Sequence, residues 1–401
     1  MLEQSFNLKN WLKLILSSLI LGILGGVTGA VFSLAIGFIT TIRFANIWLI
    51  LLLPICGLLT VFLYQKLKIS GAGTDSVLLA CNGKEKLSPW LSVGVFISSV
   101  LSHLFGASVG REGAALQIGG SLSSLISRLF RLNQHQSEIL IRAGMAGVFS
   151  AVFGTPVTAF FFALEIVKVG TIHLKSVIPC LISSLSGFFT AAFIGAHPER
   201  FTLSDVPDIS LLIILKVAIL TLLTALLSIG FCYALRYSSK FAKTVIKNPY
   251  IRIILGGVLI VLLAILVGNQ DYNGAGVNII EHIFENGNFR PEAFALKMLF
   301  TCICVAAGYK GGEIVPTLFI GATFGALISS LLGLSIPFGA ALGMVILFCG
   351  VTNCPLASIF LGIELFSGVG MWYFIPTVAV CYLISGKISL YSAQQHKFKY
   401  I

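Results

Sequence analysis

Long apolar segments recur along the whole chain, and they constrain its fold more than any other feature. A membrane-spanning helix needs about 17 to 25 such residues. In lipid the backbone must satisfy its own hydrogen bonds, so spanning segments of this kind fold as helices. We therefore predict an all-α, polytopic membrane protein with many tilted and half-spanning helices. The apolar segments lie near residues 11–40, 46–65, 89–109, 114–132, 139–169, 176–196, 209–235, 251–268, 293–308, 316–351 and 354–386.

The composition excludes a soluble globular protein. Hydrophobic residues make up 57% of the chain, against about 45 to 50% in soluble proteins. The net charge of +11 resembles that of nucleic-acid-binding proteins, but the basic residues lie in short loops between apolar segments, as in loops that face the cytoplasm. We expect a multi-pass protein of the cell membrane, embedded in the lipid bilayer, with cytoplasmic termini, no soluble domain and no nucleic-acid partner.

The cysteines and histidines do not suggest chemistry of their own. The nine cysteines are mostly isolated within apolar segments, which is typical of buried, reduced cysteines. Cys302 and Cys304 form the one close pair, and neither they nor His103 and His173 have partners at metal-ligand spacing. We expect no metal and no cofactor. An intramembrane enzyme is the remote alternative, but no nucleophile with a His or Asp partner lies in the spans.

Three ordered blocks of sequence occur twice at nearly constant spacing. Gly110-x-Glu112 recurs as Gly311-x-Glu313, 201 positions later, and Gly71-Ala72-Gly73 recurs as Gly274-Ala275-Gly276, 203 positions later. A third block, which begins at Gly144-Met145, recurs at a spacing of 199. Such self-similarity indicates an internal duplication. We predict one repeat in 1–203, a second in 204–386, and a C-terminal helix start and tail in 387–401.

The charges in the loops indicate that the two repeats have opposite orientations. Lys9 and Lys13 place the N-terminus inside, so the first Gly-Ala-Gly block follows a helix that returns to the inside. The densest basic loop, 236–252, is also inside, and the next helix exits before the second block. Inverted repeats with helices interrupted by Gly or Pro are typical of transporters whose substrate binds near the membrane midplane.

Glu112 lies in such an interruption. A carboxylate inside a bilayer costs about 2.5 to 3.5 kcal/mol on insertion scales, so it is by default a candidate for an ion or proton pathway. The N-terminus of a helix offers free backbone N–H groups that bind anions, and the glycines of both Gly-x-Glu blocks allow a close approach of the backbone. We hypothesise that Glu112 competes with an anion for this position when ionised and leaves when protonated.

Each candidate also has a structural interpretation. Glu112 would satisfy backbone donors at a helix start, and Glu313, its equivalent, would form a permanent salt bridge with Lys310. For Arg111, pairing with a carboxylate or capping of carbonyls is a stronger interpretation than contact with an ion. For Glu165 and Glu364, which occupy matching positions near helix ends, a structural role is likewise the stronger interpretation.

The motifs resemble those of the CLC family of anion channels and anion/proton antiporters. The similar segments are 110–113 (Gly-Arg-Glu-Gly), 311–316 (Gly-Gly-Glu-Ile-Val-Pro) and 386–393, and the inverted duplication fits as well. The resemblance implies a homodimer with one anion pathway per subunit, with Glu112 as the external gate and Tyr391 as the central tyrosine, although an interfacial role is the alternative for Tyr391. Phe319 is a candidate lining residue. The implied anion-binding residues are Ala72, Gly73, Thr74, Gly110, Arg111, Gly113, Gly311, Gly312, Ile314, Val315 and Tyr391.

Departures from the family pattern indicate which anion the chain transports. The usual Gly-Ser-Gly-x-Pro loop lacks its serine and proline here, Ile166 replaces the inner glutamate of chloride/proton antiporters, and Glu313 replaces an apolar residue. Together these changes resemble the branch that exchanges fluoride for protons, although Val315 stands where that branch commonly has Thr. We predict halide/proton exchange, with fluoride favoured over chloride and a passive anion channel as the alternative.

The two repeat-equivalent glutamates suggest a division of proton duties. Fluoride is small, strongly hydrated and a good hydrogen-bond acceptor, so protonatable carboxyls above and below a site would replace part of its hydration shell. Glu112 and Glu313 should reach the midplane from opposite sides. We hypothesise that Glu112 serves the external side and Glu313 the internal side.

Overall fold

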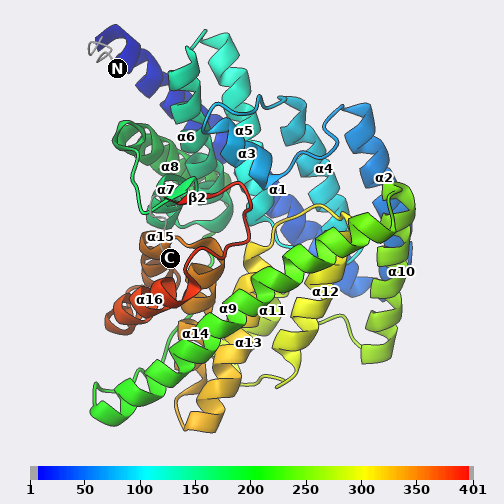
Figure 1. The fold of residues 1–401 in the computed structure, drawn as a ribbon, viewed down its shortest axis with the longest axis vertical. Helices are drawn as coiled ribbons and strands as arrows, with labels where there is room; N and C mark the ends of the chain where they lie inside the picture. Colours follow the sequence, from blue (N-terminus) through cyan, green and yellow to red (C-terminus); the bar gives the residue numbers. More distant parts are fainter. Residues whose placement is uncertain (1–7, 397–401) are drawn as a thin grey trace.

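The structure, a computed structural model, describes residues 8–396, and nearly all of its ordered elements are helices (Figure 1). The all-α prediction is confirmed apart from one pair of two-residue strands. The helices of the first half follow one another in the order α1 (Leu8–Ala45), the 3-10 helix η1 (Ile47–Leu52), α2 (Leu53–Lys66), α3 (Thr74–Ala80), α4 (Trp90–Leu104), α5 (Glu112–Leu129), α6 (Gln134–Phe153), α7 (Pro156–Glu165) and α8 (Leu174–Ile194).

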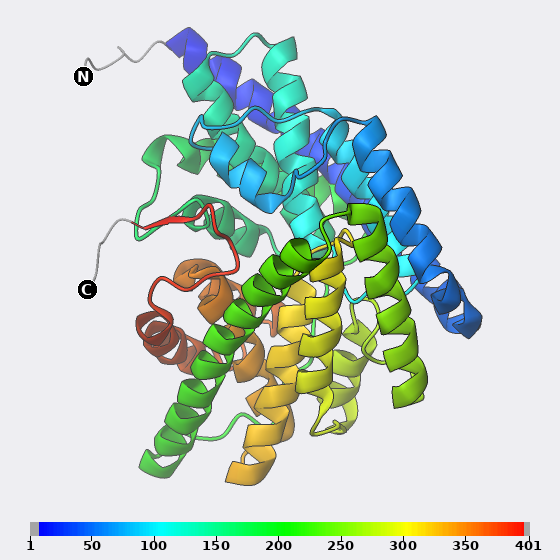
Figure 2. The same cartoon turned by 45° about the vertical axis from the view of Figure 1, so that its right-hand side comes forward.

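The second half repeats this order of α-helices. Each α-helix of the first half has a counterpart at the corresponding place, α9 for α1 and so on to α16 for α8. In Figures 1 and 2 the first half occupies mostly the upper part of the molecule and the second half mostly the lower part. The helices are α9 (Leu211–Val245), α10 (Pro249–Val267), α11 (Val277–Asn286), α12 (Ala293–Ala307), α13 (Ile314–Leu332), α14 (Ile336–Thr352), α15 (Pro355–Leu365) and α16 (Met371–Ser385).

Three apolar segments that the sequence suggested as continuous are each two helices: 139–169, 316–351 and 354–386, of which the last contains α15 and α16. Segment 139–169 is divided because α6 ends at Gly154, which has a φ of 72°, and α7 begins with Pro156. Segment 316–351 is divided because α13 ends at Gly333, with a φ of 62°, and α14 has Pro337 in its first turn. Glycine adopts the left-handed conformation that ends a helix, and proline is favoured in the first turn of the next one.

The paired helices that follow each Gly-x-Glu block are in close backbone contact. A Cβ atom on Gly119 of α5 would lie 2.1 Å from the carbonyl oxygen of Gly144 in α6. In the second half, a Cβ atom on Gly321 of α13 would lie 2.4 Å from the carbonyl oxygen of Gly343 in α14. Small residues at such crossings allow the tight packing that stabilises helix pairs in membranes.

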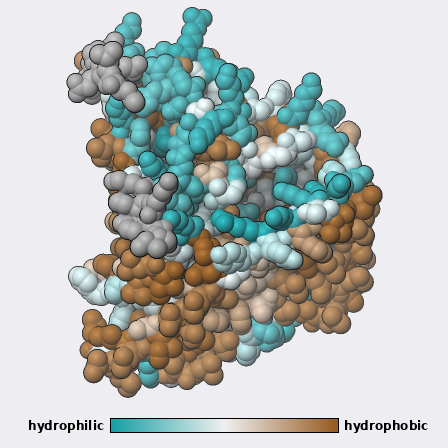
Figure 3. Space-filling view, in the orientation of Figure 1, coloured by the Kyte–Doolittle hydropathy of each residue, from teal (hydrophilic) through white to brown (hydrophobic). Residues whose placement is uncertain are grey.

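The surface has the pattern of a multi-pass membrane protein. Within residues 8–396, six helical segments are long and apolar enough to cross a bilayer: α1, the continuous segment Ile47–Lys66, α8, α9, α10 and α13. On the face that Figure 3 shows, hydrophobic residues cover the lower part and the right flank, and hydrophilic residues gather above them. The shorter helices pack between these spans, as in folds with half-spanning helices.

The C-terminal segment returns to the first half of the chain. Strand β2 (Gln395–His396) pairs in parallel with β1 (Lys168–Val169), which follows α7. The red segment of Figure 2 therefore runs from α16 toward the first half. This path brings residues 386–393 close to both repeats.

Candidate functional site

The site forms where the two Gly-x-Glu blocks meet at the centre of the molecule. Gly110 and Gly312 form an antiparallel bridge, and each donates its N–H to the carbonyl of the other at 2.6 Å. Helix α5 begins directly after Gly110 and Arg111, and α13 begins directly after Gly312 and Glu313. The N-termini of the two helices are therefore brought together, and each carries a partial positive charge.

Glycine is required at this crossing because the two backbones touch. A Cβ atom on Gly312 would lie 2.3 Å from the backbone nitrogen of Gly113. A Cβ atom on Gly113 would lie 2.8 Å from the Cα atom of Gly312. Real Cβ atoms do not approach other atoms so closely, so a side chain at either position would force the two helix starts apart.

Glu112 is fully buried, and its carboxylate lies between the two helix starts. Its Oε2 atom accepts hydrogen bonds from the backbone N–H groups of Arg111 at 3.0 Å and Val315 at 3.2 Å. Its Oε1 atom has no hydrogen-bond partner in residues 8–396. The carboxyl group is thus held by backbone donors from both repeats, in the position that a helix N-terminus offers to a bound anion.

Arg111 binds carboxylates. Its guanidinium forms an ion pair with Glu199, a residue of the linker between α8 and α9, and its Nε atom lies 3.7 Å from Oε1 of Glu112. Its Nη1 atom donates to the hydroxyl of Ser33 in α1 at 3.0 Å. This is the carboxylate pairing that the sequence favoured for Arg111.

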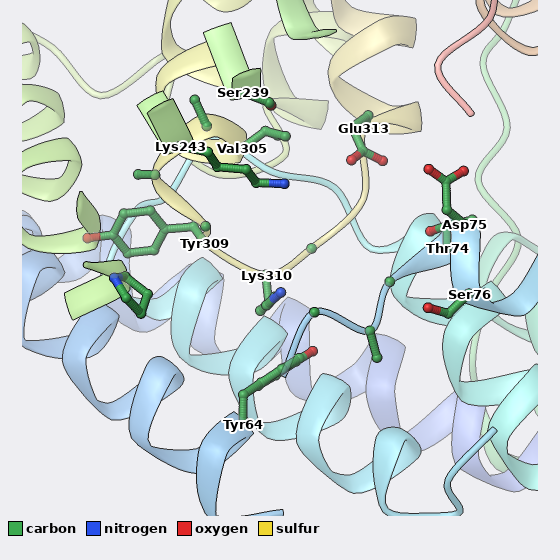
Figure 4. A pocket seen from close by; sticks show the side chains of 18 of the residues that line it. Tyr64, Thr74, Asp75, Ser76, Ser239, Lys243, Val305, Tyr309, Lys310 and Glu313 are labelled. Atoms are coloured by element: carbon green, nitrogen blue, oxygen red, sulfur yellow. The ribbon is translucent and has the colours of Figure 1, made fainter. Parts of the chain in front are cut away.

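A cavity of about 740 Å³ opens beside the site. Its lining includes five basic and two acidic residues, an excess of positive charge that attracts anions. Figure 4 shows Glu313 and Asp75 on one side of the cavity and the amines of Lys243 and Lys310 across from them. The five basic residues are Arg236, Lys240, Lys243, Arg252 and Lys310.

Glu313 does not form the salt bridge with Lys310 that was considered as its structural role. Within residues 8–396 the only ion pairs closer than 4 Å are those of Arg111, and Lys310 instead lies 4.3 Å from the centre of the Tyr64 ring. The Oε2 atom of Glu313 lies 3.5 Å from the position that a Cβ atom on Gly113 would take. Glu313 therefore reaches both the cavity, which it lines, and the crossing of the two helix starts.

Tyr391 lines the same cavity, and its buried hydroxyl has no hydrogen-bond partner in the described chain. Ser389 accepts a hydrogen bond from the backbone N–H of Tyr391 at 3.0 Å. Asp75 fixes the two residues that follow Tyr391. Its carboxylate accepts hydrogen bonds from the Ser392 hydroxyl and, at 3.1 Å, from the backbone N–H of Ala393. A buried hydroxyl without a partner is available as a donor to an anion.

Most of the other predicted residues also border this region. Ala72, Gly73, Thr74 and Gly311 line the cavity, and the hydroxyl of Thr74 accepts a hydrogen bond from Gln117 at 3.3 Å. Ile314 is buried in the first turn of α13. Phe319 is not part of the cavity lining.

Glu165 and Glu364 have the structural role that was favoured for them. The carboxylate of Glu165 accepts hydrogen bonds from Leu356 N–H at 3.2 Å and Ala357 N–H at 2.9 Å, at the start of α15. The carboxylate of Glu364 accepts from Val157 N–H at 2.9 Å and Thr158 N–H at 2.8 Å, at the start of α7. Each glutamate thus caps a helix of the other repeat, which joins the two halves.

Sequence reasoning missed two carboxylates of the site. Asp75 attracted attention only as a departure from the loop motif, and Glu199 lies in a linker without any motif. Both act through contacts with residues far away in the chain. No group of three or more His, Cys, Asp or Glu residues in 8–396 is arranged to hold a metal ion, and all nine cysteines are buried and free.

Comparisons with known sequences give concordant results. The family model of the voltage gated chloride channel matches residues 56–386. A chloride/fluoride channel protein of Pseudomonas syringae is 31% identical over 390 residues, which cover 94% of this chain and 85% of the relative. An H(+)/Cl(-) exchange transporter of Vibrio cholerae is 26% identical over 380 residues, which cover 87% of this chain and 81% of the relative.

Solved structures give the same result for the fold. A CLC-type fluoride/proton antiporter is similar with a TM-score of 0.93 and 30% identity, over 99% of this chain and 100% of that one. A slow cyanobacterial Cl-/H+ antiporter is similar with a TM-score of 0.79 and 20% identity, over 93% and 94% of the two chains. The second similarity concerns the fold alone.

Proposed function

This chain is a member of the voltage-gated chloride channel (CLC) family, and from that premise we propose that it exchanges a halide anion for protons across the membrane, with fluoride as the preferred halide. The family consists of membrane proteins, and its relatives here are named as anion channels and as anion/proton exchangers. The proposal adds the coupling to protons and the choice of halide.

The position of Glu112 carries the proposal. Its carboxylate accepts hydrogen bonds from the backbone N–H groups of Arg111 and Val315, so it occupies the place that an anion would take. Its second oxygen has no partner in the described chain. Protonation removes the negative charge that holds the side chain there, so the anion and the proton-free glutamate exclude each other. This exclusion couples the movement of the anion to that of a proton.

Glu313 is proposed as the proton acceptor on the other side of the crossing. It lines the cavity, and no ion pair within 4 Å to another residue of 8–396 fixes it. A carboxylate next to the cavity can exchange protons with water there. We assign the external proton step to Glu112 and the internal one to Glu313, and we place the cavity and both termini on the cytoplasmic side because the basic residues of α9 and α10 line it.

The anion would be bound by donors of both repeats. The candidate hydrogen-bond donors to the anion are the Tyr391 hydroxyl and the backbone N–H groups that now bind Glu112. The backbone of the Gly110, Gly113, Gly311 and Gly312 positions allows the close approach that a small ion needs. A homodimer with one such pathway per subunit completes the proposal.

Three observations favour fluoride over chloride. The loop at Ala72 lacks a serine hydroxyl, Ile166 replaces an inner glutamate, and Glu313 replaces an apolar residue. Relatives named for fluoride are also among the similar proteins. Fluoride is the stronger hydrogen-bond acceptor, so carboxyls that carry protons on both sides of the site suit it better than chloride.

Anion efflux from proteoliposomes, with pH recorded at the same time, tests the proposal. We expect fluoride efflux to exceed chloride efflux, and a fluoride gradient to drive protons uphill. The reversal potential under a proton gradient separates exchange from a passive channel, because only an exchanger shifts it with pH. Chloride efflux much faster than fluoride efflux would overturn the choice of halide.

The variant Glu112→Gln tests the mechanism. Glutamine keeps the size of the side chain but cannot carry a proton. We expect Glu112→Gln to abolish proton movement driven by the anion. The matched control is Glu165→Gln, which changes a buried glutamate that caps α15 and should retain proton movement. Uphill proton transport by Glu112→Gln would contradict the assignment.

A further inference from the structure

Glu199 and Glu112 share one guanidinium. Arg111 forms an ion pair with Glu199, and its Nε atom lies 3.7 Å from the carboxylate of Glu112. The two glutamates differ in exposure: the side chain of Glu112 is 0% exposed, and that of Glu199 is 20% exposed. One arginine thus connects a carboxylate sealed inside the protein with a carboxylate that reaches solvent.

The charges of this group favour a single shared proton. With both carboxylates ionised, the two glutamates and one arginine have a net charge of −1, which burial penalises. One proton makes the group neutral. The guanidinium of an arginine keeps its positive charge in proteins, so the proton resides on Glu112 or on Glu199. Whichever glutamate remains ionised keeps the guanidinium as its partner.

The linker places Glu199 at the membrane face opposite the large cavity. It precedes the N-terminal end of α9, whereas the cavity is lined by residues near the C-terminal end of that 35-residue helix. The backbone N–H of Glu199 donates to the carbonyl of Phe153 at the end of α6, at 3.4 Å, and Phe201 N–H donates to the carbonyl of Leu365 at 2.9 Å. These bonds hold the linker against both repeats.

Other charged groups surround Glu199 from two helices and from its own linker. Burial, and then the nearby charge of Glu199, raise the pKa of Glu281 in the short helix α11. A further carboxylate with a raised pKa beside Glu199 adds a place where a proton can bind on this face. The charged or titratable neighbours are Arg111, which directly precedes α5, Glu112 of α5, Glu281 of α11 and, nearby in sequence, His197 and Arg200 of the linker.

We propose that Glu199 is the outer proton relay of the transporter: it takes a proton from external water and passes it to Glu112 across the shared Arg111. In this step the O–H bond of the Glu199 carboxylic acid breaks and an O–H bond forms on the Glu112 carboxylate. Arg111 then pairs with the ionised Glu199. The neutral Glu112 leaves the backbone donors of α5 and α13, and the anion enters.

The inference rests on the proposed exchange of a halide for protons, and Glu199→Gln in proteoliposomes tests it. Glutamine keeps a hydrogen-bond acceptor for Arg111 but carries no proton. We expect proton transport driven by a fluoride gradient to slow by at least about tenfold, the scale of a positioned proton-transfer group. The matched control is Asp208→Asn, an exposed carboxylate of the same linker, which we expect to transport at the wild-type rate.

A second readout separates a relay from a structural role. A membrane-impermeant buffer at high concentration outside the liposomes delivers protons in place of a fixed carboxylate, so it should restore proton transport in Glu199→Gln and leave the wild type unchanged. Glu199→Asp, which keeps the carboxylate, should retain most of the rate. Equal losses in Glu199→Asp and Glu199→Gln without any effect of buffer would overturn the relay.

The outcomes for the two proposals differ. If the wild-type protein moves no protons against a halide gradient, the proposed exchange fails. If the wild type exchanges and Glu199→Gln does so at the same rate and with the same dependence on external pH, only the relay fails.

Discussion

Replacing Gly312 by alanine tests whether the crossing of the two helix starts is as close as the structure indicates. The added Cβ atom would lie 2.3 Å from the backbone nitrogen of Gly113 and 3.1 Å from that of Glu112. Relief of these contacts requires the helix starts to separate, which breaks the two 2.6 Å hydrogen bonds between Gly110 and Gly312. At about 1 kcal/mol for each hydrogen bond and about 1–3 kcal/mol for overpacking, the loss of stability is about 3–5 kcal/mol.

The cysteines provide the assay. All nine are buried, so a thiol-reactive fluorophore reports the thermal unfolding of detergent-solubilised protein. At about 2 °C for each kcal/mol in a chain of this size, Gly312→Ala should lower the unfolding temperature by roughly 6–10 °C and abolish anion exchange.

Gly230→Ala in α9 is the matched control for this variant. A Cβ atom on Gly230 would have nothing within 4 Å. Alanine there favours the helix by about 0.5–1 kcal/mol, so we expect an unfolding temperature equal to or above that of the wild type. A Gly312→Ala protein that unfolds at the wild-type temperature would refute the close crossing.

Two further predictions concern carboxylates that position the site. Asp75→Asn weakens the charge-assisted hydrogen bonds to Ser392 and Ala393, next to Tyr391. The lost hydrogen-bond energy is about 1–2 kcal/mol, so we expect anion efflux to slow severalfold. An unchanged rate would show that this contact does not position the tyrosine. Glu165→Ala removes the cap of α15 and should reduce the free energy of unfolding by about 0.5–2 kcal/mol. We expect a lower unfolding temperature in the thiol assay and an unchanged ratio of fluoride to chloride efflux. A changed ratio would contradict a purely structural role.

The sequence was sufficient to predict the helical membrane fold and its inverted repeat, because these depend on local patterns. The length of an apolar segment predicts a membrane span. The Gly-x-Glu blocks predict interrupted helices without any knowledge of the tertiary structure. The helix breaks at Gly154 and Gly333 were also readable in principle, since each precedes a proline by a few residues. They were missed because hydropathy alone does not register a turn inside an apolar segment.

The contacts of Glu199 and Asp75 were not predictable in this way. Arg111 and Glu199 are 88 positions apart, and Asp75 and Ala393 are 318 positions apart. No periodicity or motif joins such pairs, because their contacts depend on how distant segments pack in the tertiary structure. Pairing of Arg111 with some carboxylate was expected, whereas its particular partners depend on the tertiary structure.

The two Gly-Ala-Gly loops show where the inverted symmetry of the fold ends. Gly71 and Gly73 have nothing within 4 Å of their Cβ positions, and they line the large cavity. At the equivalent loop, a Cβ atom on Gly274 would lie 2.0 Å from Nη1 of Arg43. The space that is open at one loop is therefore filled by a buried cation at the other.

A second buried basic side chain, Lys297, fills further space at the same loop. Lys297 is 0% exposed, donates to the carbonyls of Tyr272 and Gly274 at 3.1 and 2.7 Å, and lies over the ring of Phe319. Within residues 8–396 no acidic side chain lies within 4 Å of either this amine or Arg43. Both basic side chains lie beside the second Gly-Ala-Gly loop, and neither lines the 740 Å³ cavity. The two Gly-Ala-Gly loops therefore differ in their surroundings: the first faces a wide cavity with a basic lining, and the second packs around two buried basic side chains.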